Sequence, residues 1–283
     1  MTTDRIKTLY VSDMDGTLLN ADSKVSPKSS HIISSLTRNG AMITVATART
    51  PATVVPLLSR ADISIPAIVM TGAAMWDWKA NRYISPKFID TDTVSSVCGI
   101  LSSHGMTPFV YTLEGDCMLS VYHTSPSLTV SEQGFVTPRT GLPLKRFLIG
   151  TPIPETAMGR TMLIFAIGRI GEADVAAADI TAATGCAVSA YPDIFNHNEA
   201  FIEVFAPGVS KAQAVRELAK RTGAGRTVVF GDNLNDIPMM EAADLAVAVG
   251  NAFEEVKAAA DITIGANTAD SVAMFIENDF NSH

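Results

Sequence analysis

Short apolar runs alternate with amphipathic segments over the first ninety residues, a pattern that predicts parallel strands joined by covering helices. The apolar runs predict strands at residues 9–11, 42–46 and 67–70. The intervening helices are expected to begin at Ser26-Pro27 and Thr50-Pro51, where a capping side chain precedes a proline at the first helical position. Three strands and two helices of an open α/β sheet are therefore expected before Gly72.

The C-terminal part of the chain repeats this pattern. A helix is predicted from Ser210, with Val215 and Leu218 on its apolar side and Gly223 at its end. Further strands are predicted at residues 227–230, 245–249 and 262–264. Together the two stretches indicate an α/β fold with a Rossmann-like parallel-sheet core.

The middle of the chain has a different texture, with scattered Pro and Gly and fewer regular periods. Helix candidates follow Asp92 and Gly171, and strand candidates lie at Phe109, Met118, Met162, Val188 and Ile202. We therefore expect an inserted α+β domain at residues 83–207, with the core formed by residues 1–82 and 208–283.

Composition places the chain among ordinary globular proteins. Its 283 residues are 47% hydrophobic and 18% charged, enough for one large domain or two smaller ones. A net charge of -8 disfavours nucleic acid and anionic membrane surfaces as partners. No secretory signal or membrane-spanning run is apparent, so a cytoplasmic location is expected. The three cysteines form no Cys-x-x-Cys pair, which disfavours a zinc or redox site.

Two acidic groups directly follow predicted strands. Asp13 and Asp15 come after residues 9–11, and Asp232 and Asp236 come after residues 227–230. Parallel strands present their carboxyl ends at one edge of the sheet, where open α/β sheets bind ligands. Carboxylates about 4 Å apart repel by roughly 4 kcal/mol at an effective dielectric of 20, so such a cluster requires a cation. Oxygen ligands favour Mg²⁺; either group alone would also fit a solvated turn or a helix cap.

Other motifs for metals and nucleotides are not matched. An EF-hand loop beginning at Asp13 would need Gly where Leu18 stands and Glu where Lys24 stands. The sequence also lacks a P-loop, a dinucleotide-binding glycine fingerprint and a Gly-x-Ser-x-Gly elbow. A metal-linked carboxylate cluster instead suits phosphoryl transfer through an aspartyl-phosphate. Thr47 offers a hydroxyl donor, and Lys211 lies at a helix start, where the dipole disfavours a cation unless an anion accompanies it.

Taken together, these segments resemble the motifs of the haloacid dehalogenase (HAD) superfamily, and more narrowly its Cof-type sugar-phosphatase-like branch with a C2B cap. The four motifs are matched in order and spacing by residues 13–18, residues 46–49, Lys211 and residues 231–236. The inserted segment lies between the second and third motifs, where this branch carries its cap. The sequence departs from the branch at Ala48, where Gly is usual, and at Thr71, where Asn is usual, which leaves ligand orientation open.

The resemblance implies a role for each matched residue. Asp13 would be the nucleophile, and Asp15 would be the general acid and later the base for water. Mg²⁺ would be held by Asp13, Asp232 and the main-chain oxygen of Asp15, with Asp236 at the metal or just behind it. The phosphoryl group would be bound by a further set of residues, namely Thr47, Ala48, Arg49, Lys211 and Asn235.

The activity implied is that of an Mg²⁺-dependent phosphatase, a phosphoric monoester hydrolase acting on small phosphorylated metabolites. Sugar phosphates come first, with pyridoxal phosphate and flavin mononucleotide as further candidates. A phosphomutase of the same superfamily and a non-catalytic phosphometabolite-binding protein remain alternatives. The expected partner is a small phosphate ester, and the protein is expected to be a monomer or a homodimer.

Two polar segments of the predicted insertion are interpreted as surface features. Arg139, Lys145 and Arg146 form a basic cluster that is more typical of a solvated surface than of a site for a second anionic group. Asn196-His197-Asn198 is expected to form a turn between two strands.

Overall fold

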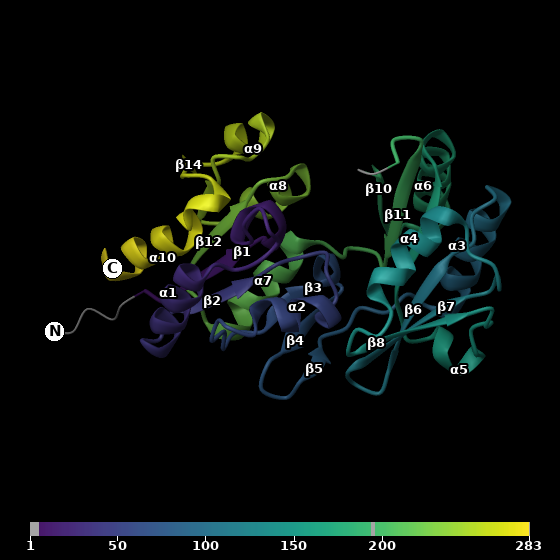
Figure 1. Cartoon of the computed structure of the whole chain (residues 1–283), viewed down its shortest axis with the longest axis horizontal. Coiled ribbons are helices and arrows are strands. Elements are labelled where there is room, and N and C mark those ends of the chain that lie inside the picture. Colours follow the sequence, from purple (N-terminus) through teal and green to yellow (C-terminus); the bar gives the residue numbers. More distant parts are fainter. Residues whose placement is uncertain (1–5, 194–195, 283) are drawn as a thin grey trace. The chain divides into compact units, whose positions relative to one another are not determined.

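The structure, a computed structural model, describes residues 6–193 and 196–282. The chain divides into two compact units, Met1–Ile84 with Ser210–His283, and Ser85–Val209 (Figure 1). These divisions lie two residues beyond each predicted boundary. Each unit has its own β-structure and its own buried core. No helix of the described residues is long and apolar enough to cross a bilayer.

The first unit is built on a five-stranded sheet in which every pairing is parallel. Its strand order is β14-β13-β12-β1-β2. The bounds are β1 Thr8–Ser12, β2 Met42–Val45, β12 Arg226–Gly231, β13 Leu245–Ala248 and β14 Ile262–Thr263. The central strands are apolar and fully buried, as the runs of Leu and Val in them predict. The parallel core is therefore confirmed.

Six α-helices of the described residues accompany this sheet, and the three whose starts were predicted begin at those positions. They are α1 Pro27–Arg38, α2 Pro51–Leu58, α7 Lys211–Thr222, α8 Ile237–Met240, α9 Glu254–Ala259 and α10 Ser271–Ser282. The Ser26 hydroxyl accepts the Ser29 N–H at the start of α1, and the Ser210 hydroxyl accepts the Gln213 N–H at the start of α7. Helix α1 packs on α10 and α7 packs on α8, so both faces of the sheet are covered (Figure 1).

The third predicted strand behaves differently from the expectation. Residues Ala67–Val69 form β3, which meets the parallel sheet only at a bridge between Ala46 and Ile68. Its main pairing is antiparallel, in a small sheet with β4 (Ala74–Asp77) and β5 (Arg82–Ile84). The cause is local, because three consecutive residues after β3 have positive φ and turn the chain back on itself.

The inserted unit carries a six-stranded mixed sheet of order β10-β11-β9-β6-β7-β8. Its strands are β6 Phe109–Glu114, β7 Met118–His123, β8 Lys145–Ile149, β9 Thr161–Arg169, β10 Ala187–Pro192 and β11 Glu199–Phe205, and its helices are α3 Thr91–Ser103, α4 Val130–Val136, α5 Glu155–Met158 and α6 Ile170–Thr184. All pairings are antiparallel except β7 with β8. The five predicted strand positions are confirmed, whereas β8 was not predicted.

The expected turn at Asn196-His197-Asn198 is also confirmed. The Glu199 N–H donates to the Asn196 carbonyl at 2.9 Å, and the Asn198 N–H reaches the Asn196 side chain at 3.3 Å. These bonds close the connection between β10 and β11.

Candidate active site

The carboxyl ends of β1 and β12 place the two acidic groups side by side. Ser12 is paired with Phe230, and the Asp13 N–H donates to the Phe230 carbonyl at 2.9 Å. The next residues of the two strands therefore leave the sheet together. One carboxylate oxygen from each of Asp13, Asp232 and Asp236 lies within 4.8 Å of the others. The structure thus brings three of the four predicted acids into one cluster.

Lys211 joins this cluster from the first position of α7. Its Nζ donates to Asp13 Oδ1 at 2.5 Å and to Asp236 Oδ1 at 2.8 Å. The side chain is only 3% exposed. Its unfavourable position at the positive end of a helix dipole is therefore offset by two buried carboxylates.

Asp236 organises the loop after β12. It is fully buried, and its Oδ2 accepts the N–H groups of Asp232 and Asn233 at 3.1 and 3.2 Å. Since Oδ1 already accepts from Lys211, both carboxylate oxygens of Asp236 are engaged. Its position is fixed from two directions, and it in turn fixes the backbone that carries Asp232.

A glycine is required where the first motif passes beneath Asp232. Gly16 has φ +78°, and a Cβ at this position would lie 2.3 Å from Asp232 Oδ2. The next residue, Thr17, donates its hydroxyl to Asp232 Oδ1 at 2.7 Å. The loop after β1 and the loop after β12 are therefore joined by this side-chain hydrogen bond as well as by the pairing of their strands.

Asp15 lies apart from the three-acid cluster and pairs with Arg49. The guanidinium donates from Nε to Asp15 Oδ2 at 2.7 Å and from Nη2 to Oδ1 at 2.6 Å, a bidentate arrangement. The Asp15 side chain is half exposed. Arg49 was predicted from the sequence as a phosphate ligand, but in this structure its guanidinium pairs with Asp15, the predicted general acid. The metal role proposed for Asp15 concerns its main-chain oxygen and stays a prediction.

The remaining nominated residues occupy different environments. Thr47 is buried after β2, and its Oγ1 accepts the Arg49 N–H at 3.1 Å. Ala48 is exposed on its loop, and Asn235 is exposed in the short 3-10 helix Leu234–Asp236. Thr71, which replaces the usual Asn, has φ +57° and ψ +18°, the left-handed region that disfavours β-branched residues. The phosphate-binding roles of these residues stay predictions.

Burial controls the electrostatics of the cluster. It raises the pKa of Asp13 to about 7, with Asp236 adding to the shift and Lys211 opposing it. Burial also raises the pKa of Asp232 to about 6, against the hydrogen bond from Thr17. Burial alone would lower the pKa of Lys211, but the attraction of Asp13 and Asp236 outweighs it and the pKa is raised. Both aspartates therefore bind protons more tightly than an ordinary aspartate, and a further cation nearby would favour their ionised forms.

The donor set suits a divalent oxygen-loving ion. With all three carboxylates ionised, Lys211 leaves two negative charges uncompensated. Asp13 and Asp232 each keep one carboxylate oxygen outside the hydrogen bonds described above, whereas both oxygens of Asp236 are in use. Mg²⁺ typically binds one or two carboxylates and keeps several waters. Asp13 and Asp232 would therefore hold it, with Asp236 behind them.

Two residues of this site were not given a role from sequence. Thr17 was seen only as part of the motif around Asp13. Asn251 was not nominated, yet its Nδ2 donates to the Gly16 carbonyl at 2.8 Å and its Oδ1 accepts the Asn267 N–H at 2.8 Å. Asn251 lies three residues beyond the end of β13, so a polar residue shortly after a buried strand was an available signal.

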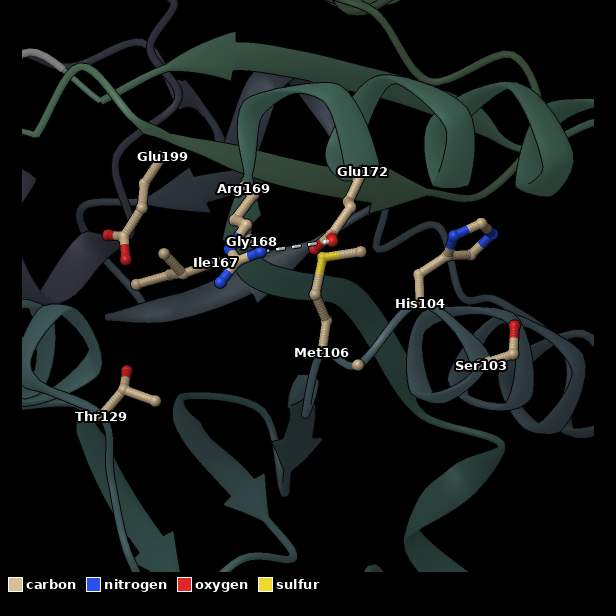
Figure 2. Close-up of a pocket in the computed structure, with 10 residues that line it drawn as sticks. Ser103, His104, Met106, Thr129, Ile167, Gly168, Arg169, Glu172 and Glu199 are labelled. Carbon is tan, nitrogen blue, oxygen red and sulfur yellow. Dashed lines mark ion pairs between the residues drawn. The ribbon is translucent and has the colours of Figure 1, made fainter.

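The inserted unit has a separate cavity of about 600 Å³ beside the start of α6 (Figure 2). Its lining combines both charges, and Arg169 is paired with Glu172 at 4.0 Å. The Glu199 side chain points into the same space in Figure 2, and its Oε2 is buried without a hydrogen-bond partner. This mixed lining lacks the acid cluster found in the first unit.

Comparison with known proteins identifies relatives along nearly the whole chain. Residues 10–276 match the family described as haloacid dehalogenase-like hydrolases. The chain is 26% identical over 271 residues to the pyridoxal phosphate phosphatase of Escherichia coli strain K12, covering 93% of this chain and 95% of that protein. It is 25% identical over 272 residues to a 5-amino-6-(5-phospho-D-ribitylamino)uracil phosphatase of Bacillus subtilis strain 168, covering 95% and 94%.

Solved structures share the fold. A haloacid dehalogenase-like hydrolase from Bacteroides thetaiotaomicron superposes with a TM-score of 0.78 at 21% identity, covering 98% of this chain and all of that one. A sugar phosphatase of HAD subclass IIB superposes with a TM-score of 0.72 at 21% identity, covering 97% and 99%. Both superpositions cover nearly the whole chain, so these two structures share its α/β fold.

Proposed function

The chain belongs to the haloacid dehalogenase-like hydrolases, and from that premise we propose that it is an Mg²⁺-dependent phosphatase of small phosphorylated metabolites that works through an aspartyl-phosphate. Two relatives that it matches along nearly their whole length are named phosphatases, and the enzyme is a phosphoric monoester hydrolase. One observation carries the mechanistic part. A buried aspartate, Asp13, lies at a sheet edge against both a buried lysine and a second acid group.

The residues divide the reaction between them. Asp13 attacks phosphorus and takes the phosphoryl group while the ester oxygen leaves. Lys211, held between Asp13 and Asp236, neutralises charge on the nucleophile and the phosphoryl oxygens. A bound Mg²⁺ would supply further charge neutralisation and favour the ionised form of Asp13, whose pKa burial raises to about 7.

Asp15 handles the protons, and Arg49 positions it. As general acid, Asp15 protonates the leaving alkoxide; as base, it accepts a proton from the water that hydrolyses the aspartyl-phosphate. Its half-exposed carboxylate is oriented by the bidentate contact with Arg49, rather than by the buried cluster. The two aspartates therefore lie in different environments suited to different tasks.

The substrate class follows from chemistry and relatives. Pyridoxal phosphate and a phosphoribitylamino-uracil are monoesters of small polar alcohols, and they are the substrates named for two relatives. We propose that this enzyme acts on monoesters of that size, with sugar phosphates included. Such a substrate needs no nucleic-acid surface, in keeping with the net charge of -8.

Phosphate release tests the assignment. Purified protein with Mg²⁺ is expected to release inorganic phosphate from one or more members of a metabolite panel, and EDTA is expected to abolish this release. Asp13→Asn should lose at least about a thousandfold in kcat, whereas Asp62→Asn, at an exposed ion pair with Arg38, should not. Residual activity above about one per cent would refute the nucleophile. An isomerised sugar phosphate without free phosphate would instead indicate a phosphomutase.

The leaving group tests the role of Asp15. Asp15→Asn removes the proton donor while leaving the nucleophile in place. Alkyl phosphates need protonation of the departing alkoxide, whereas p-nitrophenolate leaves readily without it. The variant should therefore lose about tenfold more kcat with alkyl esters than with p-nitrophenyl phosphate. Equal losses on both substrates would remove Asp15 from the proton transfer.

A further inference from the structure

Two lysines are buried within the described part of the chain, Lys211 and Lys145. Lys211 contacts two carboxylates. Lys145, at the start of β8 in the inserted unit, is 7% exposed, yet its Nζ has no ion pair and no hydrogen bond among residues 6–193 and 196–282. The Nζ atom itself is not fully enclosed, so a small ion can reach the ammonium group. With so little of the side chain exposed, its lack of an anion partner calls for an explanation.

The surroundings of Lys145 are aromatic and positively charged. Its Nζ lies 5.5 Å from the centre of the Phe147 ring, two residues along the same face of β8. Burial lowers the pKa of Lys145 to about 8, and the nearby positive charge of Arg139 contributes to that shift. The Arg139 guanidinium stacks on Phe135 at 4.2 Å. Two cations therefore share one face of the sheet.

The neighbouring Arg146 shows how an ordinary surface cation behaves in this fold. Its side chain projects from the opposite face of β8, where its Nη2 contacts Glu114 and its Nε donates to Ser120 Oγ at 2.9 Å. The expectation of a solvated basic surface therefore fits Arg146 but is wrong for Lys145. Strand β8 therefore carries Arg146, exposed and paired with Glu114, on one face and Lys145, buried and not paired with any carboxylate of the described residues, on the other.

Nearby acids do not supply the missing charge. In the same unit, the charge of Glu203 adds to the effect of burial in raising the pKa of Tyr111 and of Tyr191. Burial raises the pKa of Glu203 to about 7, and the neighbouring Tyr191 opposes that shift. No ion pair or hydrogen bond joins Glu203 to Lys145, and both residues lie in the described part of the chain.

We propose that Lys145, with Arg139 beside it, forms an anion site on the inserted unit that binds a carboxylate or phosphate group of a small molecule. The aromatic wall and the low exposure of the Lys145 side chain strengthen such a contact, because they lower the local dielectric. The anion is either a separate small molecule or a second charged group of the phosphate ester. The second source rests on the proposed function, whereas the site itself does not.

Direct binding is measured on the full-length, Mg²⁺-free protein by amide NMR. Malonate and inorganic phosphate are titrated separately at constant ionic strength, with sodium chloride as the reference salt. We expect saturable shifts at the amides of residues 139 and 145–147. Lys145→Met should weaken this binding at least tenfold, Lys145→Arg should retain it, and Arg146→Met should leave it unchanged.

Several results would overturn the site. The wild-type titration alone decides if Lys145→Met fails to fold, because absent or non-saturable shifts at residues 145–147 would mean that the Lys145 head simply reaches solvent. Shifts confined to residues 168–172 would place the anion at the cavity of Figure 2 instead. Equal affinities in the wild type and Lys145→Met would remove the lysine from binding.

Kinetics with matched substrates identify the source of the anion. 3-Phosphoglycerate differs from glycerol 3-phosphate by a carboxylate, and fructose 1,6-bisphosphate differs from fructose 1-phosphate by a second phosphate. A preference in kcat/KM for the more charged partner that Lys145→Met loses, while Arg146→Met keeps it, assigns the anion to the substrate. This ratio is independent of the folded fraction, since both substrates meet the same preparation. If phosphate is released without any such preference, the anion bound at Lys145 is a separate molecule. If no phosphate is released from any substrate, the proposed function is refuted, whereas the anion site is still judged by the NMR titration.

Discussion

Asp13 and Asp232 bind protons more tightly than ordinary aspartates, with pKa values raised to about 7 and about 6 by burial. Since each pKa is higher in the folded chain than in the unfolded one, rising pH destabilises the metal-free fold between about 4 and 7. A bound divalent ion requires the ionised carboxylates and reverses that loss.

The increase in melting temperature on adding Mg²⁺ is therefore expected to be larger at pH 8 than at pH 5, and Mg²⁺ binding should release protons. Scanning calorimetry at the two pH values, with and without the ion, measures the first effect. Asp232→Asn serves as the comparison, because it should remove most of the Mg²⁺ response. A response independent of pH would contradict the assignment of these acids as ligands.

Thr71 occupies a backbone conformation that suits its residue type poorly. With φ +57° and ψ +18°, a β-branched side chain is strained, whereas Asn adopts this region readily. Thr71→Asn is therefore expected to stabilise the protein by about 1 kcal/mol, measured by chemical denaturation. Thr71→Val keeps the branch and should give no such gain. A Thr71→Asn variant no more stable than the wild type would show that the strain is compensated elsewhere.

The positions of the site residues can be predicted from the sequence more readily than the side chains that they contact. Asp13, Asp232 and Lys211 were identifiable because each directly adjoins a recognisable strand end or helix start. The contact of Arg49 with Asp15 was not, because both lie on loops and the direction of a loop side chain depends on tertiary structure.

At the level of elements, the turn after β3 and the start of α7 approach each other very closely. Gly72 has φ +98°, and a Cβ there would lie 2.4 Å from the Ser210 carbonyl oxygen. Ser210 caps α7, whose first residue is Lys211. The turn therefore sets where the lysine of the site begins its helix.

Gly72→Ala is expected to destabilise the protein by several kcal/mol and to lower kcat as Lys211 shifts. Gly40→Ala is the matched control, because Gly40 also has positive φ, at +92°, but nothing lies within 4 Å of its added Cβ. That variant should lose only about 1 kcal/mol. Chemical denaturation measures the loss of stability, and phosphate release measures the loss of kcat. Equal losses in the two variants would show that backbone strain, and not the close contact with Ser210, causes the effect.

The elements missed by sequence analysis have identifiable causes. Strand β8 begins with Lys145-Arg146 and so lacks an apolar start, although Lys145 is in fact buried. Strand β3 has the expected apolar residues but joins another sheet, since its pairing is decided by the turn that follows. Apolar pattern predicts that a strand exists; its partner depends on connections that pattern does not encode.

On the scale of the whole molecule, the inserted unit has the features of an independent domain. Residues 85–209 contain a complete six-stranded sheet, and a cluster of stacked aromatic rings around Phe135 lies within it. Expressed alone, these residues are expected to unfold in a single cooperative thermal transition followed by circular dichroism. A broad, non-cooperative transition would show that the unit depends on the remainder of the chain.

The pairing of β1 with β12 has a consequence for how such proteins diversify. The register of these strands, rather than the length of chain between them, fixes the separation of Asp13 from Asp232. Segments can therefore be lengthened, shortened or exchanged between the two strands without changing the distance between the reacting groups. New specificities can then arise in the intervening sequence while the chemistry is inherited intact.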